Sequence, residues 1–540
     1  MSNHKDKNDE DVLGNSEAIL AQEIPAGVDR RKFLMRSAVI GAATVMTGRV
    51  VSARDRTLKA YNESLPQQPS APPLDKNLNV VKKGAGPVMT TIDEFYKVGP
   101  GPSSSHTIGP MRITYDFYQR ATKLPADKLA KSTKLQVNLF GSLSATGKGH
   151  GTERAALAGL VGKEPATVDP AFLDGLRDKP DQVFPVKLGS STINVSLKDV
   201  IYDATKGNFH HPNTMTVKLL AGNEVLLEQE YYSVGGGFIE WKGYTPPKKN
   251  DPKYPFRTMK ELRAHADNNK LTIAQVMMAN EMSIAGRSTD EVNVFVDKII
   301  NAMVATVKSG LAMPEDDVLP GPIKLHSKAA TVYKRAMDDA NAAERGVGML
   351  SACALAASEE NARGHLVITA PTGGSAGVMP SIVFALSEVR KLPLQKIRDG
   401  MLAAAAVGYL CKHHATLSAA EGGCQAEIGV ASSMAAALLA TAMDAESRVV
   451  ENAAESALEH HLGMTCDPVA GYVQVPCVER CAFGAVKAWT AYAIASNEIA
   501  SRHRIDLDAT IQALAETAKD MNGKYKETSE AGLALSVTLC

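Results

Sequence analysis

The chain has 540 residues, of which 44% are hydrophobic and 22% charged, a globular composition that excludes disorder throughout. Its length predicts about two to four domains. The 59 Lys and Arg residues balance 59 Asp and Glu residues, which argues against nucleic-acid binding as the main function. We therefore expect no nucleic-acid partner. No stretch reaches the ~18–20 apolar residues of a membrane-spanning helix, so we expect no membrane partner for the mature protein either.

Residues 1–53 have the features of an export signal. The pair Arg30-Arg31 precedes an uncharged apolar run from Ser37 to Thr47, and a small-residue, cleavage-like site follows. The segment resembles a twin-arginine signal and predicts a periplasmic location, with a cytoplasmic location as the alternative. An amphipathic helix packed on the body of the protein is the other interpretation. The Pro-rich residues 54–87 are expected to form a disordered tether.

Residues 88–244 predict a compact α/β domain. Leu135–Phe140, Thr216–Leu220 and Val225–Tyr232 contain apolar alternation that is typical of strands. Helical patterns lie between them, at residues 112–123 and 153–161. A linker rich in proline and charge follows at residues 245–256.

Residues 257–540 predict an all-helical domain. Strand signals nearly vanish there, and long segments rich in Ala, Leu and Met follow one another. Alanine has the highest helix propensity and allows helices to approach closely. The predicted fold is therefore an α/β domain followed by an all-α domain.

The loop Gly99–Gly109 is the first candidate site. It places three serines, His106 and Thr107 between Gly/Pro turns and an expected helix. Hydroxyls and free backbone N–H groups at a helix start suit a small carboxylate, and histidine can move a proton near neutral pH. An ordinary helix cap with a surface histidine is the alternative. A second polar segment, Phe209–Met215, favours the functional interpretation if the two segments converge.

Two glycine-rich segments do not match nucleotide-binding motifs. In Phe140–Gly149, five residues separate Gly141 from Gly147, so we expect a turn and no P-loop. Ala370–Met379 contains no G-x-G-x-x-G fingerprint. Its backbone N–H groups could cradle a carboxylate, and a tight turn leading into a helix is an equally good interpretation.

All 7 cysteines fall in the C-terminal part of the chain, from Cys353 to Cys540, which argues against a secreted disulfide framework. There is no C-x-x-C pair, so a zinc ribbon or a two-cluster ferredoxin is not expected.

Three of the cysteines lie close to Gly or Pro, where a thiolate can project from a turn: Cys424, Cys466 and Cys477. Three widely spaced ligands would leave one corner of a cubane cluster free for substrate. Inert buried cysteines are the alternative, and three others are expected to be of this kind: Cys353, Cys411 and Cys481. Spacing alone does not select three ligands from these six.

Five motifs in order resemble the single-chain form of the iron–sulfur-dependent L-serine dehydratases: Gly101–Pro110, Tyr232–Gly237, Ala370–Gly377, Ala420–Gln425 and Thr465–Gly471. The resemblance runs from Val88 to the C-terminus and leaves out the first 87 residues. It implies a substrate-binding α/β domain and a helical catalytic domain with a [4Fe–4S] cluster, held by Cys424, Cys466 and Cys477. It also implies that no pyridoxal phosphate is used.

The family's reaction converts L-serine to pyruvate and ammonia. An open iron would act as a Lewis acid toward the β-hydroxyl, and we expect His106 to remove the α-proton. Substrate-orienting residues are expected in both loops: Ser103, Ser104, Ser105, Thr107, Thr372, Gly373, Gly374 and Ser375. A cysteine desulfidase-like lyase and a non-enzymatic amino-acid-binding sensor are the alternatives. We expect a homodimer.

The last residue, Cys540, is expected to be a labile ligand of the resting cluster. The preceding Glu530–Leu539 segment is apolar enough to dock, and Cys540 would then offer a thiolate and the α-carboxylate together. Substrate would displace this cap. A frayed chain end without a role is the alternative.

Overall fold

The computed structural model of the chain describes residues 86–205, 207, 209–245 and 248–536. The chain separates into a unit Met1–Gln67, of which no residue is described, and a unit Gln68–Cys540, to which all described residues belong. The predicted export signal, nearly all of the predicted tether and Cys540 lie outside the described residues.

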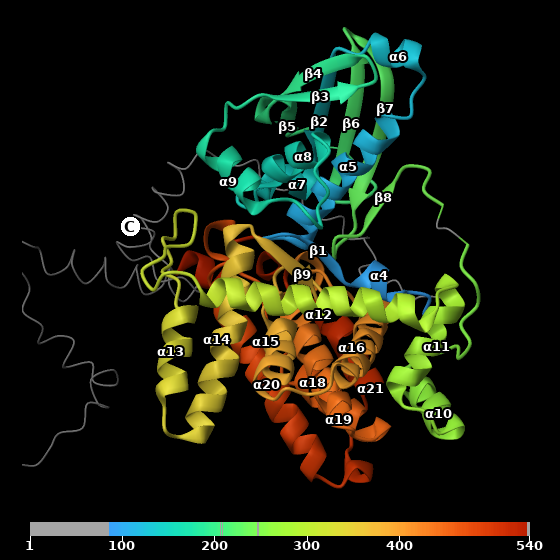
Figure 1. Ribbon diagram of the computed structural model, residues 1–540, viewed down its shortest axis with the longest axis vertical. Helices are drawn as coiled ribbons and strands as arrows, with labels where there is room; N and C mark the ends of the chain where they lie inside the picture. The colour runs from blue at the N-terminus through green and yellow to red at the C-terminus, as the bar shows by residue number, and fades with distance from the viewer. Residues whose placement is uncertain (1–85, 206, 208, 246–247, 537–540) are drawn as a thin grey trace, which may run out of the picture. The chain divides into compact units, whose positions relative to one another are not determined.

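The α/β region is built on a five-stranded sheet with the order β5-β2-β6-β7-β8 (Figure 1). Strand β2 pairs parallel with β5 and antiparallel with β6, and the remaining neighbours are antiparallel. The strands are β2 (Lys134–Leu139), β5 (Val200–Tyr202), β6 (Thr214–Ala221), β7 (Glu224–Ser233) and β8 (Ile239–Trp241), with a separate hairpin of β3 (Phe184–Leu188) and β4 (Ser191–Val195). The helices are α4 (Ile92–Phe95), α5 (Gly109–Ala121), α6 (Ala126–Ala130), α7 (Gly141–Thr146), α8 (Thr152–Leu160) and α9 (Pro170–Asp178).

Apolar alternation positions this sheet, as the sequence predicts. Along β2, Leu135, Val137 and Leu139 are buried, and the residues between them are not. The buried side chains form one core with those of α5, including Met111 and Phe117. The three predicted strands and both predicted helices of this region are confirmed. The glycine-rich segment expected to be a turn forms α7.

The C-terminal region is mostly helical. Its helices are α10 (Met259–Asn269), α11 (Ile273–Ala285), α12 (Thr289–Leu311), α13 (Ala329–Asp338), α14 (Ala342–Arg363), α15 (Val378–Phe384), α16 (Leu394–His414), α17 (Ala419–Gly422), α18 (Val430–Ala442), α19 (Ser447–Glu459), α20 (Cys477–Asn497) and α21 (Leu507–Asp520). Helix α18 packs against α16, α19 and α20. Small side chains make this close packing possible, as expected from the alanine content.

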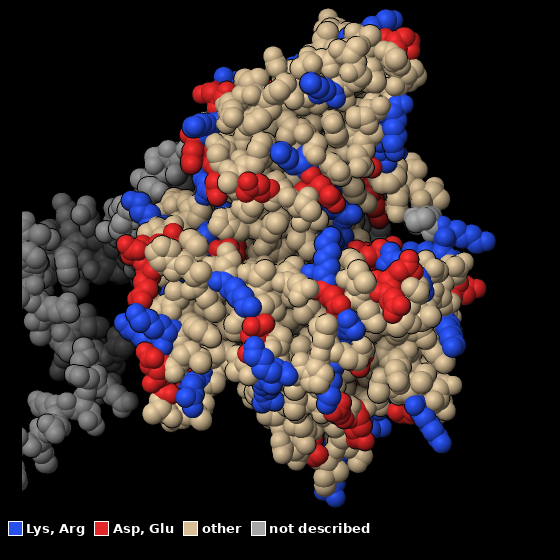
Figure 2. All heavy atoms as spheres, in the orientation of Figure 1, with Lys and Arg blue, Asp and Glu red and all other residues tan. Residues whose placement is uncertain are grey.

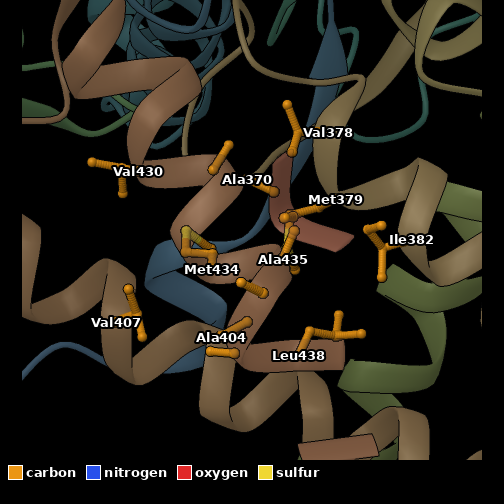
Figure 3. Packing of buried hydrophobic residues seen from close by; sticks show 14 of the residues in the cluster. Ala370, Val378, Met379, Ile382, Ala404, Val407, Val430, Met434, Ala435 and Leu438 are labelled. Carbon is orange, nitrogen blue, oxygen red and sulfur yellow. The ribbon is translucent and has the colours of Figure 1, made fainter. Parts of the chain in front are cut away.

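Figure 3 shows the contact between α16 and α18, where Ala404 and Val407 lie near Met434, Ala435 and Leu438. A Cβ added at Gly400 of α16 would lie 2.7 Å from the carbonyl oxygen of Leu438, so only glycine fits at this crossing.

One strand corrects the expectation of an all-helical region. Strand β9 (Leu366–Thr369) pairs antiparallel with β1 (Lys97–Pro100), with Lys97 opposite Thr369. A run of three apolar residues and a threonine is compatible with helix and strand alike, and its partner stands 272 positions earlier. The local pattern therefore could not reveal the pairing, which ties the start of the α/β region to the helical region.

The surface agrees with the zero net charge. Figure 2 shows basic and acidic side chains interspersed over the face in view. Among the described residues, no helix combines the length and the apolar character needed to cross a membrane.

Buried Glu281 of α11 links α4 to the helical core. Its carboxylate accepts hydrogen bonds from the backbone N–H of Ile92 at 3.0 Å and from the hydroxyl of Tyr409 at 3.0 Å. Burial raises the pKa of Glu281 to about 7, because the hydrogen bonds compensate only part of the lost hydration. The folded protein therefore holds a proton on Glu281 more tightly than the unfolded chain, where the pKa is about 4.3.

We expect Glu281→Gln to remove a pH-dependent contribution to stability. A raised carboxyl pKa stabilises the fold at low pH, and this stabilisation is lost as the pH rises through about 7. The free energy of unfolding of the variant, relative to that of the wild type, should therefore increase by about 2–3 kcal/mol as the pH rises from about 5 to about 8. Unfolding midpoints at both pH values measure the difference. Glu446→Gln, at the exposed start of α19, is the control and should follow the wild type. A constant difference between Glu281→Gln and the wild type would contradict the account.

Candidate functional site

The serine loop, residues 101–108, leaves β1 and turns into α5 through a π-helical turn. Ser103 begins this turn because its Oγ accepts the backbone N–H of His106 at 3.1 Å. The side chains of Ser104 and Thr107 are buried beside it, whereas Ser105 is half-buried. His106 is only 2% exposed, which rules out a surface histidine.

Two hydroxyls hold the imidazole of His106. Nδ1 lies 2.8 Å from the Oγ of Ser105, and Nε2 lies 3.0 Å from the Oγ of Ser142 in α7. Burial lowers the pKa of His106 well below its usual range, and the nearby ring of His150 lowers it further. The ring is therefore neutral near pH 7, with an N–H on one nitrogen and a lone pair on the other, each within hydrogen-bond distance of a serine hydroxyl.

The remaining groups of this loop fix its shape. Thr107 donates to the carbonyl of His150 at 2.8 Å and accepts from the N–H of Ser103 at 3.2 Å. Ser233, from the Tyr232–Gly237 motif, donates to the carbonyl of Ser105 at 2.7 Å.

The polar segment Phe209–Met215 also reaches the serine loop, as the functional interpretation requires. The N–H of Ser142 donates to the carbonyl of Pro212 at 2.8 Å. His211 is close enough to His106 to contribute to its lowered pKa. The convergence expected from the sequence is therefore confirmed.

A second loop, Thr372–Ser375, follows β9 and contacts the serine loop. The Oγ of Ser375 accepts from the N–H of Thr372 at 3.3 Å and closes the turn. A Cβ added at Gly373 would lie 2.9 Å from the carbonyl oxygen of Pro102 and 3.0 Å from the nitrogen of Ser104. The two predicted substrate loops thus meet backbone to backbone.

The three cysteines selected by the resemblance are buried together. Cys424 lies between α17 and a π-helical turn at Gln425–Gly429, and Cys477 is the first residue of α20. Hydrogen bonds from the thiols of Cys466 and Cys477 lower the pKa of Cys424 well below its usual range. Arg480 lowers the pKa of Cys424 further, because its guanidinium donates a hydrogen bond to the Sγ of Cys424 at 3.2 Å. Donation to Cys424 and burial raise the pKa values of the two partner thiols.

The donor set fits the group that the resemblance implies. Within the described ranges, no three His, Cys, Asp or Glu side chains are arranged to hold a single metal ion. Three converging sulfurs, with a guanidinium to balance thiolate charge, are nevertheless the ligand chemistry of an iron–sulfur cluster. The cysteines expected to be inert are buried: Cys353, Cys411 and Cys481. Burial raises their pKa values, that of Cys353 to about 12.

Two carboxyl groups that are largely but not fully buried connect the cysteines to the loops. Glu427, in the turn after Cys424, hydrogen-bonds to Thr372, and its Oε2 lies 2.6 Å from where a Cβ of Gly374 would stand. Glu527 donates its backbone N–H to the carbonyl of Cys466 at 2.8 Å. Cysteine site and loops therefore form one continuous site.

A chain of side-chain contacts through His150 also connects Glu527 to His106. The Oε1 of Glu527 lies 3.9 Å from the Nε2 of His150, and the rings of His150 and His106 are 4.8 Å apart. Burial lowers the pKa of His150 to about 4, so the ring is neutral and the contact is not an ion pair. Burial also raises the pKa of Glu527 to about 7 and that of Glu427 well above its usual range.

The C-terminal segment lies along the loop that carries Cys466. The carbonyl of Tyr525 accepts the N–H of Cys466 at 2.8 Å, and Ser529 donates to the carbonyl of Pro468 at 2.6 Å. The N–H of Leu533 donates to the carboxylate of Asp467. Part of the segment Glu530–Leu539 therefore docks, through buried Ala531 and the backbone of Leu533, whereas the apolar side chains of Leu533 and Leu535 are exposed. The role of Cys540 stays a prediction.

Sequence reasoning missed five residues of this site: Ser142, His150, Glu427, Arg480 and Glu527. Glu427 and Arg480 stand three positions after Cys424 and Cys477, about one helical turn, so their spacing was a usable signal. Ser142 lies inside the glycine-rich segment Phe140–Gly149 and His150 directly follows it, but the interpretation of this segment as a phosphate loop or a turn assigned no role to either side chain. Glu527 reaches Cys466 through the tertiary structure, and no local pattern identifies it.

Comparison with known proteins agrees with this two-part site. Residues 91–244 match the family model of the serine dehydratase beta chain, and residues 268–534 match that of the alpha chain. An L-serine dehydratase of Haemophilus influenzae is 37% identical over 460 residues, covering 83% of this chain and 99% of the relative. One from Streptomyces coelicolor is 39% identical over 466 residues, with coverage of 83% and 99%. L-serine dehydratase 2 of Escherichia coli is 37% identical over 470 residues, with coverage of 84% and 100%.

Proposed function

Since the chain belongs to the serine dehydratase family and is a lyase that acts as an L-serine dehydratase, we propose that His106 takes the α-proton of L-serine at an iron–sulfur cluster held by Cys424, Cys466 and Cys477. The observation that supports this assignment most is the contact of the serine loop and the Thr372 turn with the cysteine site. The desulfidase and sensor alternatives lose support, because both parts of the chain match serine dehydratase chains.

The reaction must overcome two chemical difficulties. The α-proton of serine is weakly acidic, and its β-hydroxyl is a poor leaving group, so both a base and an acid are needed. When bound, an iron–sulfur cluster with an open coordination position supplies a Lewis acid for the departing hydroxyl. Elimination yields an enamine that tautomerises and hydrolyses in water to pyruvate and ammonia.

The neutral ring of His106 is suited to act as the base. Ser105 and Ser142 hold both nitrogens, and a hydroxyl can donate to a ring lone pair or accept from a ring N–H. The same two hydroxyls can therefore support the ring before and after it takes a proton. A positioned base of this kind contributes about 10²–10⁴-fold to the rate.

The carboxyl groups of Glu427 and Glu527 and the two loops can bind the charged α-ammonium and carboxylate groups of the substrate. Glu427 and Glu527 lie beside Cys424, where they offer oxygen acceptors to the α-ammonium group of serine. The hydroxyl- and glycine-rich loops at Ser103–Ser105 and Thr372–Ser375 offer donors to its carboxylate.

We expect that anaerobically purified protein contains about four irons per chain and releases pyruvate from L-serine. Replacing Cys424, Cys466 or Cys477 by alanine should remove both iron and activity, because each would supply a ligand. Cys353→Ala is the matched control, since this cysteine is also buried but its thiol contacts the Sδ of Met349, at 3.9 Å, and none of the three candidate ligands. The iron and sulfide content and the release of pyruvate are measured for each variant. A full iron content in Cys466→Ala would contradict the assignment.

His106→Ala should keep its iron and lose activity by about 100-fold or more, because the base is removed while the cysteines are untouched. The control is His265→Ala, on α10, whose ring contacts the carbonyl of Pro255 and is not part of the site. Iron content, the absorption spectrum and kcat for L-serine are measured on the same anaerobic samples. A variant that retains more than about a tenth of the wild-type kcat would show that His106 is not the base.

A further inference from the structure

A cleft of about 250 Å³ lies next to the catalytic site and is lined by both regions of the chain. Lys148, Arg154 and Arg177 line it from the α/β region. Arg363 and Tyr472 line it from the helical region. Pro102, at the start of the serine loop, borders the cleft, but His106 and the three candidate ligand cysteines do not. The cleft therefore adjoins the place where the reaction is proposed to occur without containing it.

The lining of the cleft has an excess of positive charge. It contains four cationic side chains and a single carboxylate, Glu153. Arg363 is neutralised, since it pairs with Asp317 at 2.6 Å and with Glu360 at 3.0 Å.

Two of the cations lack such compensation. Arg177 pairs with Asp174, but Arg154 donates only to the carbonyl of Leu173, at 3.5 Å, among the described residues. Lys148 stands over the ring of Tyr202, 5.7 Å from its centre, and no described carboxylate pairs with it. The one carboxylate of the lining, Glu153, accepts the hydroxyl of Tyr202 and forms no ion pair with either cation among the described residues.

The backbone makes room for the guanidinium of Arg154 at the start of α8. A Cβ added at Gly151, whose φ is +62°, would lie 2.4 Å from Nη2 of Arg154. Arg154 and Arg177 both line the cleft. Burial lowers the pKa of Arg177, and repulsion from Arg154 lowers it further. Like charges held in one cleft favour an anion between them.

We propose that this cleft binds a small dianion, either a phosphate monoester or a dicarboxylate, held by Arg154, Arg177 and Lys148. A dianion supplies one negative charge for each of the two uncompensated cations, and paired guanidinium groups suit phosphate and carboxylate oxygens.

The bound dianion would touch the loop between two candidate cluster ligands. Tyr472, which lies between Cys466 and Cys477 in the sequence, lines the same cleft, and its ring packs against Gly321. The dianion therefore bridges the α/β region and the cysteine loop. This site goes beyond the proposed function and does not depend on it.

Titration calorimetry of the anaerobic full-length protein tests the proposal, with inorganic phosphate and malonate as separate probes at constant ionic strength. We expect one dianion to bind per chain, and acetate to bind more weakly. The stronger of the two dianions identifies the class of ligand. Arg154→Gln and Arg177→Gln should each weaken binding by roughly tenfold or more. Lys187→Gln, on the exposed face of β3, is the matched control and should bind as the wild type does.

Two results would overturn the proposal. If neither phosphate nor malonate binds at millimolar concentration, the cleft is not a dianion site. If binding is equally strong in Arg154→Gln and Arg177→Gln, the anion sits elsewhere, for example at the cysteines. Melting temperatures confirm that the variants fold. Should either arginine variant fail to fold, Lys148→Gln, which alters an exposed side chain, must show the weakened binding instead.

Discussion

The close approach of two backbone loops is the constraint on which the site depends. At Gly373 a Cβ would stand 2.9 Å from the carbonyl oxygen of Pro102, so the Thr372 turn and the serine loop meet with no side chain between them. The pairing of β1 with β9 supplies both loops, because each strand leads directly into one of them. Without this contact, the loop that carries His106 would not meet the Thr372 turn, which contacts Glu427 beside Cys424.

The fold could be predicted where local sequence decides structure. Alternation along Leu135–Phe140 and the alanine-rich segments after residue 257 predicted a sheet region and a mostly helical region, and both exist. The strand Leu366–Thr369 was not predicted, because a short apolar run fits several structures and the partner strand lies far away in the chain. The segment Gly141–Thr146 was expected to be a turn because of its flanking glycines, yet its Ser, Leu and Ala residues form a helix.

The site could be predicted in its motifs but not in its connections. Loops rich in hydroxyls and glycine can be recognised in the sequence as candidate anion-binding sites. The spacing of the six cysteines does not distinguish cluster ligands from inert core residues, so the choice of three ligands required the resemblance. Ser142 and Glu527 were missed because they reach His106 and Cys466 through tertiary contacts. Burial also decides the charge state of the site: it keeps the His106 and His150 rings neutral while raising the carboxyl pKa values beside Cys424.

The central claim is that residues of both regions act on one substrate beside an iron–sulfur cluster. The most direct measurement is anomalous diffraction at the iron edge from crystals of the anaerobically purified protein. The account predicts one compact iron peak per chain, bordered by the sulfurs of Cys424, Cys466 and Cys477 and facing the ring of His106. A peak at any other set of residues, or active crystals without iron, would contradict it.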